Sequence, residues 1–170
     1  MPGHASTLDQ LLATHGITRT MVAYGRAADR GRTDLYVLQF VEDGVLEITG
    51  DTFDAGRYEG RTAIAERIEQ SKRDLADGFG ATLLRHHLSN IDVELDSPTE
   101  ARASCYWMAV TQAGPDHWGR YRDEFVRGDD DKWRLRHRQV IHEGFRAGSW
   151  IETANERLRQ STSAGSGDVG

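Results

Sequence analysis

The sequence predicts an α+β domain in which helices come first and an antiparallel sheet follows. Apolar residues recur at helical spacing in the first half of the chain, over residues 17–28 and 61–76. Four strand-like segments occupy the second half, over residues 83–96, 101–112, 118–128 and 132–145. Sequential strands with short links favour an antiparallel meander, and helices that precede strands argue against a doubly wound parallel sheet.

The first helix gathers its apolar side chains on one stripe and ends near a glycine. Gly31 follows the last apolar position and acts as a helix stop. Asp29 lies seven residues after Val22, so it falls near the same side of the helix, at the C-terminal edge of the apolar surface. The stripe consists of Ile17, Met21, Tyr24 and Ala28.

The segment between the two helices contains a capped apolar run and a short strand. Thr33 caps the run over residues 35–41, and residues 45–50 have the composition of a strand. The second helix, residues 61–76, directs Ile64 toward the core.

The length and composition predict one globular domain. With 170 residues, of which 38% are hydrophobic and 28% charged, the chain can form a single core but not two comfortable ones. We expect one domain over residues 1–150, and the end of a C-terminal helix with a flexible tail over residues 151–170. The helix is expected over residues 149–159, because the residues that follow are small and polar.

Charge and cysteine content argue against several classes of protein. The net charge is −6 and the arginines are scattered, which is not the pattern of a nucleic-acid-binding protein. The single cysteine, Cys105, cannot form an intramolecular disulfide and sits in an apolar run, as a core residue does. No apolar stretch reaches membrane length and the N-terminus does not resemble a signal peptide. We therefore expect a cytoplasmic protein.

Strand alternation directs several ionisable side chains toward the interior. In residues 118–128, Asp123 shares a face with the apolar positions. In residues 132–145, the same alternation points His137 inward and Arg138 outward. A buried charge is costly unless it is paired or hydrogen-bonded, so we expect a pocket with water or an acid–histidine pair.

The adjacent histidines His86 and His87 must point to opposite faces of a regular strand. Provided that no bulge intervenes, His87 shares a face with Ile91 and Val93 and is favoured for the pocket. His86 remains a weaker candidate for the same pocket. The other histidines, at positions 4, 15, 117 and 142, are interpreted as surface or loop residues.

No sequence pattern indicates a metal or an organic cofactor. The histidines never fall at i, i+4 on a predicted helix, and neither a cysteine pair nor an HExxH motif occurs. No glycine-rich phosphate loop follows a strand, and no GxSxG nucleophile elbow is present. We expect a site without metal or cofactor.

Several segments, taken in order, resemble the SnoaL-like branch of the NTF2-like superfamily. The matching text is YGRAAD, DGVLEITG, YEGRTAI, RHHL and WRLRHRQV, within residues 17–142. The resemblance implies a cone-shaped fold of the cystatin-like kind, in which a curved antiparallel sheet wraps around N-terminal helices. It also implies a deep pocket at the open end of the cone.

Within this branch, the chain looks most similar to scytalone dehydratase-like and bile-acid dehydratase-like proteins. Those use an aspartate of the first helix and a histidine of the middle strand, with tyrosines as helpers. The resemblance therefore implies Asp29, His87 and Tyr24 as catalytic residues. The family pattern expects a further acid or histidine on residues 101–112, where this chain offers Tyr106, Trp107 and Gln112 instead. The remaining candidate pocket residues are His86, Tyr106, Trp107, Tyr121, Asp123 and His137.

The chemistry that these residues suggest is proton abstraction next to a carbonyl. His87 would be the general base, Asp29 would hold its tautomer, and Tyr24 would donate a hydrogen bond to the enolate oxygen. The expected function is a cofactor-independent lyase or isomerase of dehydratase type. Its substrate would be a small, cyclic, oxygenated, hydrophobic molecule of polyketide, steroid or terpenoid type.

Two alternatives stay open at this point. The chain could be a non-catalytic NTF2-like binding module or the small subunit of an aromatic-ring dioxygenase. It could also be an epoxide hydrolase, which would require Asp123 and not His87. The expected partners are a hydrophobic small molecule and further copies of the chain in a homodimer or homotrimer, with no nucleic acid and no membrane.

Overall fold

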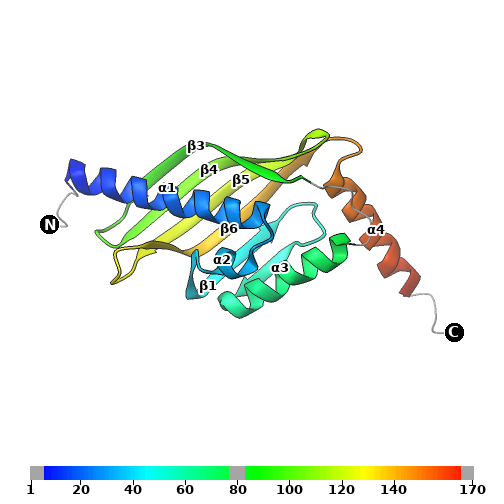
Figure 1. Ribbon diagram of the computed structural model, residues 1–170, viewed down its shortest axis with the longest axis horizontal. Helices are drawn as coiled ribbons and strands as arrows, with labels where there is room; N and C mark the ends of the chain where they lie inside the picture. Colours follow the sequence, from blue (N-terminus) through cyan, green and yellow to red (C-terminus); the bar gives the residue numbers. More distant parts are fainter. Residues whose placement is uncertain (1–5, 77–82, 166–170) are drawn as a thin grey trace.

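A computed structural model describes residues 6–76 and 83–165 of the chain. Helices come first and the long strands follow, as the sequence predicts (Figure 1). The helices are α1 (Thr7–Asp29), α2 (Thr33–Val37), α3 (Gly60–Ala76) and α4 (Trp150–Gly165). The strands are β1 (Phe40–Thr49), β2 (Gly56–Glu59), β3 (Arg85–Leu95), β4 (Glu100–Thr111), β5 (Gly114–Arg127) and β6 (Trp133–Phe145).

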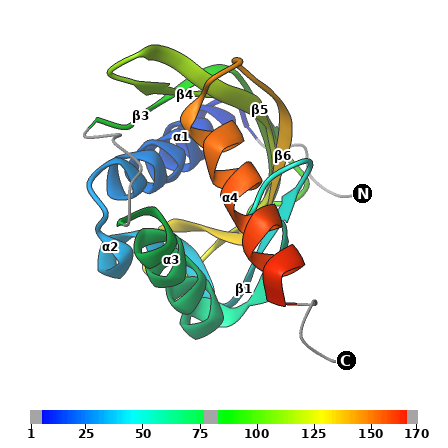
Figure 2. The same cartoon turned by 90° about the vertical axis from the view of Figure 1, so that its right-hand side faces the viewer.

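The described strands form one sheet in the order β2-β1-β6-β5-β4-β3. Consecutive strands from β3 to β6 pair antiparallel, which confirms the predicted meander, and β1 joins it by pairing parallel to β6. The sheet curves around α1, and α4 lies across one end of the resulting cone (Figure 2). This architecture is the wrapped α+β fold that the resemblance implies.

Helix α1 begins at a capping box and buries one face against the sheet. The Ser6 hydroxyl accepts the backbone N–H of Asp9, while the Asp9 carboxylate accepts from the Ser6 backbone. The Thr20 hydroxyl donates to the Trp133 carbonyl at 2.7 Å, which fixes the helix to β6. The predicted apolar stripe is confirmed, since its buried positions include Ile17, Met21 and Tyr24.

A bulge in β3 changes which side chains face α1 halfway along the strand. Its pairing with β4 shifts between Ser89 and Asp92, and Asn90 adopts a left-handed φ of 53°. Before the bulge the partly buried positions carry even numbers, His86 among them, and after it they carry odd numbers. The prediction that His87 points inward assumed an uninterrupted strand and is wrong, because the side chain is exposed.

A similar irregularity in β6 has the same effect. The neighbours Glu124 and Phe125 of β5 pair with His137 and Leu135 of β6. Arg136, which lies between those two residues of β6, has no opposite residue and forms a bulge. The inward face therefore passes from Leu135 to Arg138, which is fully buried. The prediction that His137 points inward and Arg138 outward is wrong for this reason. His137 instead contacts the Glu47 carboxylate of β1, with 3.0 Å between Nε2 and Oε2.

Helix α4 extends the fold beyond the predicted helix. Its span, Trp150–Gly165, is longer than the expected residues 149–159, so the first residues assigned to the tail are helical. The rest of the predicted tail, residues 166–170, lies outside the described residues. Among the described helices, none has both the length and the apolarity needed to cross a membrane.

The bulge in β3 gives a stability prediction. Asn90→Val should lower the free energy of unfolding by about 1–2 kcal/mol, because a β-branched residue is strained at a left-handed φ. Asn90→Gly is the matched control and should keep the stability, since glycine adopts this conformation freely. Urea denaturation followed by circular dichroism measures both. Equal stability of the two variants would show that the strand does not need this conformation.

Candidate active site

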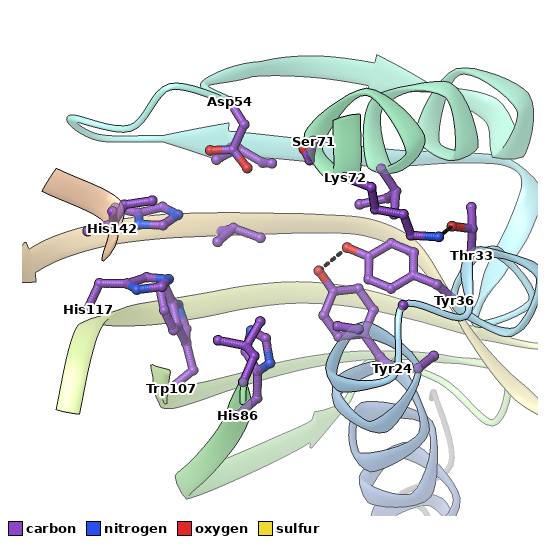
Figure 3. A pocket seen from close by; sticks show the side chains of 18 of the residues that line it. Tyr24, Thr33, Tyr36, Asp54, Ser71, Lys72, His86, Trp107, His117 and His142 are labelled. Atoms are coloured by element: carbon purple, nitrogen blue, oxygen red, sulfur yellow. Dashed lines mark hydrogen bonds between the residues drawn. The ribbon is translucent and has the colours of Figure 1, made fainter. Parts of the chain in front are cut away.

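A cavity of about 520 Å³ opens between the inner face of the sheet and the helices α1, α2 and α3, and the start of α4 also lines it (Figure 3). This volume suits a small molecule, because ligand pockets typically measure about 300–1,000 Å³. Its lining is rich in aromatic side chains, which favours an apolar ligand. The aromatic lining residues are Tyr24, Tyr36, Phe53, Trp107, Tyr121 and Trp150.

An acid–imidazole pair stands at one wall of the cavity. His86 of β3 lines the cavity, and its Nδ1 lies 2.7 Å from Oδ1 of Asp29, the last residue of α1. The same carboxylate oxygen accepts the backbone N–H of His86 at 3.0 Å. The two side chains are only 14% and 12% exposed. Because Asp29 occupies Nδ1, Nε2 is the nitrogen of His86 that can reach a ligand.

Two tyrosines meet beside this pair. The Tyr36 hydroxyl of α2 donates a hydrogen bond to the Tyr24 hydroxyl of α1, drawn as a dashed line in Figure 3. Burial raises the pKa of Tyr24, although the nearby Arg138 charge opposes the shift. Burial also raises the pKa of Tyr36 well above its usual value. Both phenols are therefore protonated near neutral pH, and the hydrogen of Tyr24 can be donated to a ligand oxygen.

A buried ion pair packs against the rings of Tyr24 and Tyr121. Arg138 of β6 donates two hydrogen bonds to Asp123 of β5, with Nε to Oδ1 at 2.8 Å and Nη2 to Oδ2 at 2.5 Å. The guanidinium lies 4.0 Å from the ring centre of Tyr24 and 4.1 Å from that of Tyr121. Burial opposes the charge of Arg138, but Asp123 raises the pKa of the guanidinium above its usual value, so it stays charged.

Two histidines line the other end of the cavity, although their places in the sequence predict surface or loop residues. His117 of β5 is 5% exposed, and its Nδ1 lies 2.9 Å from Oδ2 of the buried Asp116. His142 of β6 stacks on it with ring centres 5.6 Å apart. The inward direction of His142 follows from the bulge in β6, so alternation in the sequence could not find it. The Asp–His dipeptide beside a turn was the available signal for His117.

The remaining predicted pocket residues divide between the two faces of the sheet. Trp107 and Tyr121 line the cavity as expected. Tyr106 is 52% exposed, because alternation along β4 directs it away from its neighbour Trp107, so this prediction is wrong. Asp123 faces inward as predicted, but the ion pair with Arg138 holds it beneath the cavity and it is not a lining residue.

The groups that meet in the cavity are suited to moving protons. Among the described residues, no group of three or more histidine, cysteine, aspartate or glutamate side chains is arranged to hold a metal ion. Cys105 is buried, and burial raises the pKa of its thiol to about 12, so it is not a nucleophile at neutral pH. Imidazoles held by carboxylates can accept and donate protons, and protonated phenols can stabilise a developing oxyanion.

The chain matches a known domain family over most of its length. The model of the SnoaL-like domain family matches residues 9–139. This match covers most of the chain, so the protein belongs to the SnoaL-like domain family. No curated protein matches the chain.

Solved structures share the fold at low sequence identity. A candidate scytalone dehydratase from Novosphingobium aromaticivorans is 23% identical with a TM-score of 0.67, over 82% of this chain and 89% of that one. A protein of unknown function from Mycobacterium tuberculosis is 19% identical with a TM-score of 0.67, over 92% and 96% of the two chains. The beta subunit of a candidate aromatic-ring-hydroxylating dioxygenase from Novosphingobium aromaticivorans is 17% identical with a TM-score of 0.63, over 81% and 93%. At these identities the likeness establishes the fold alone, which is described for related structures as cystatin-like and NTF2-like.

The buried ion pair gives a second stability prediction. Asp123→Leu should lower the free energy of unfolding by about 3–5 kcal/mol, because it leaves the Arg138 charge buried without a counterion. The double variant Asp123→Leu with Arg138→Met removes both charges and should recover most of that loss. Chemical denaturation of both variants measures the difference. A double variant that is as unstable as the single one would contradict this explanation.

Proposed function

We propose that this SnoaL-like protein is a cofactor-independent lyase or isomerase that removes a proton next to a carbonyl group. The observation that carries the proposal is the Asp29–His86 pair at the wall of an apolar cavity, next to two protonated tyrosines. His86 takes the role that the resemblance implies for His87, because His86 lines the cavity and His87 is exposed.

His86 acts as the general base. Its Nε2 accepts the proton from carbon, and the carboxylate of Asp29 holds the ring in the required tautomer and stabilises the imidazolium that forms. The second hydrogen bond, from the His86 backbone to the same carboxylate, fixes the position of Asp29. A positioned base of this kind contributes a factor of about 10²–10⁴ in rate.

Tyr24 stabilises the enolate that proton removal creates. Its oxygen accepts the hydrogen of Tyr36, so its own hydrogen is available to the carbonyl oxygen of the substrate. The buried charge of Arg138, 4.0 Å from the Tyr24 ring, favours negative charge at this end of the cavity. Donors placed in a site that excludes water are worth more than the same donors in solution.

The lining of the cavity suggests the class of substrate. Aromatic rings from α1, α2, β4, β5 and α4 and from the loop between β1 and β2 surround a space of about 520 Å³, so a compact, mostly apolar ring system fits best. The polar groups that can orient it are imidazoles and hydroxyls, together with the charged side chains of Arg32, Asp54 and Lys72 in the lining. A cyclic oxygenated molecule of polyketide, steroid or terpenoid type has this combination of properties.

One alternative has a specific observation in its favour. The fold is shared with a dioxygenase beta subunit, so a non-catalytic role as a binding module or small subunit is the second candidate. The epoxide hydrolase alternative needs Asp123 in the cavity, and its engagement with Arg138 beneath the tyrosines argues against that role.

The base is tested with His86→Gln and its matched control His87→Gln. The two residues are adjacent in β3, but only His86 lines the cavity. The probe is 3-hydroxy-1-tetralone, a bicyclic β-hydroxy ketone, in deuterium oxide, and proton NMR follows deuterium entering the carbon between the carbonyl and the hydroxyl-bearing carbon. His86→Gln should slow this exchange by a factor of about 10²–10⁴, and His87→Gln should leave it unchanged.

Two results would overturn the proposed function. One is a wild-type protein that exchanges the probe no faster than denatured protein does, which would favour the binding module. The other is a His86→Gln variant that exchanges at the wild-type rate. Asp29→Asn is a second variant of the same pair and should also slow the exchange, because it no longer supports the imidazolium.

A further inference from the structure

A second acid–imidazole pair stands in the same cavity and has no part in the function proposed above. Asp116 and His117 form it at the start of β5, with 2.9 Å between Oδ2 and Nδ1. Both side chains are buried, at 1% and 7% exposure, and His117 lines the cavity. The geometry repeats that of Asp29 and His86, because in each pair the carboxylate occupies Nδ1 and leaves Nε2 for a ligand.

Asp116 is held in the ionised form that such a pair needs. Burial alone would raise its pKa, but hydrogen bonds outweigh burial and keep the pKa of Asp116 below its usual value. The donors are His117 and the backbone N–H groups of Trp150 and Ile151 at the start of α4, at 2.8 and 3.3 Å. The carboxylate therefore carries a negative charge that stabilises a positive charge on the His117 ring.

The imidazole of His142, next to His117, differs from it in its hydrogen bonding and in its pKa. His142 stacks on His117 with an angle of 10° between the rings, yet no carboxylate lies at hydrogen-bond distance from it among the described residues. Burial lowers the pKa of His142 to about 4, although Asp54 opposes the shift. His142 is therefore neutral near pH 7, and of the two stacked rings His117 is the one that pairs with a carboxylate.

Trp107 lies between the two acid–imidazole pairs. Its ring centre is 6.4 Å from that of His86 and 5.4 Å from that of His117, and Figure 3 shows it between them. The indole Nε1 is buried and has no hydrogen-bond partner among the described residues. A buried donor without a partner is costly, so Trp107 places an unsatisfied polar group between the two pairs.

We propose that His117 is a second catalytic residue, a general acid that protonates the leaving hydroxyl of a β-hydroxy ketone held between His86 and His117. This proposal rests on the proposed function and narrows it to dehydration. Asp116 is a positioning residue, because it acts through His117.

The step balances with these two groups alone. The C–H bond next to the carbonyl breaks, its proton passes to Nε2 of His86, and the electron pair enters the enolate. The enolate then re-forms the carbonyl and a carbon–carbon double bond, while the C–O bond at the β-carbon breaks. The departing oxygen takes the proton from Nε2 of His117 and leaves as water. Proton transfer through solvent from His86 to His117 restores the starting state.

The test separates the two proton transfers on one probe. With 3-hydroxy-1-tetralone in deuterium oxide, deuterium at the acidic carbon reports the base. Loss of water gives the enone, which becomes aromatic by moving a proton from C4 to oxygen, so formation of 1-naphthol reports dehydration. His117→Asn keeps an N–H near the position of Nδ1 that can donate to Asp116, but removes the Nε2 acid. It should slow naphthol formation by a factor of about 10²–10⁴ while exchange continues at the wild-type rate.

The controls distinguish the failure of this proposal from the failure of the proposed function. His86→Gln should lose both exchange and naphthol formation. His137→Gln should lose neither, because that histidine pairs with Glu47 away from the cavity. His117→Gln is a second variant in case His117→Asn does not fold, and thermal unfolding checks both.

Each outcome decides one question. Two results would overturn the role of His117 and leave that of His86 intact. In one, folded His117 variants form naphthol at the wild-type rate. In the other, they lose deuterium exchange and naphthol formation to the same extent. If His86→Gln exchanges normally, the proposed function is overturned. Asp116→Asn should also slow dehydration while deuterium exchange continues at the wild-type rate. If it lowers stability but affects both reactions equally, Asp116 has only a structural role.

Discussion

Bulges in β3 and β6 determine which side chains reach the cavity. Each bulge adds one residue to its strand. The alternation of side chains therefore reverses at the bulge, so a residue that regular pairing would place on the outer face lies on the inner one. The bulge in β3 brings His86 inward together with the apolar residues nearer the end of the strand, and that in β6 brings in Arg138 and His142. The inward positions of His86, Arg138 and His142 all depend on these local departures from regular pairing.

The fold could be predicted from the sequence because it rests on patterns that are local and repeated. The stripe of Ile17, Met21 and Tyr24 predicted α1, and sequential strands predicted the meander. The site was harder to predict, because a one-residue shift reverses the face of every later residue in a strand. The helical pattern places Asp29 at the edge of the apolar surface, but strand alternation points to His87 instead of His86 and to His137 instead of Arg138. Nothing in the strand composition marks where a ladder will bulge.

The polar groups of the cavity follow a common arrangement in which carboxylates hold cationic or ionisable partners in place. Asp29 contacts His86, Asp116 contacts His117, and Asp123 contacts Arg138. Each pair satisfies polar atoms that would otherwise be buried at a cost, so the aromatic lining can exclude water around them. An apolar cavity can therefore contain several ionisable groups, each with a fixed orientation and its own protonation state.

The two backbone hydrogen bonds at the start of α4 link this C-terminal helix to the chemistry of the cavity. The SnoaL-like match ends at residue 139, whereas α4 begins at Trp150, yet its first N–H groups bind the carboxylate that holds His117. Docking of α4 and the orientation of that imidazole are therefore thermodynamically linked, and each stabilises the other. Sequence changes in this helix, beyond the residues that match the family, would therefore alter the hydrogen bonds that orient a side chain at the opposite end of the cavity from the tyrosines.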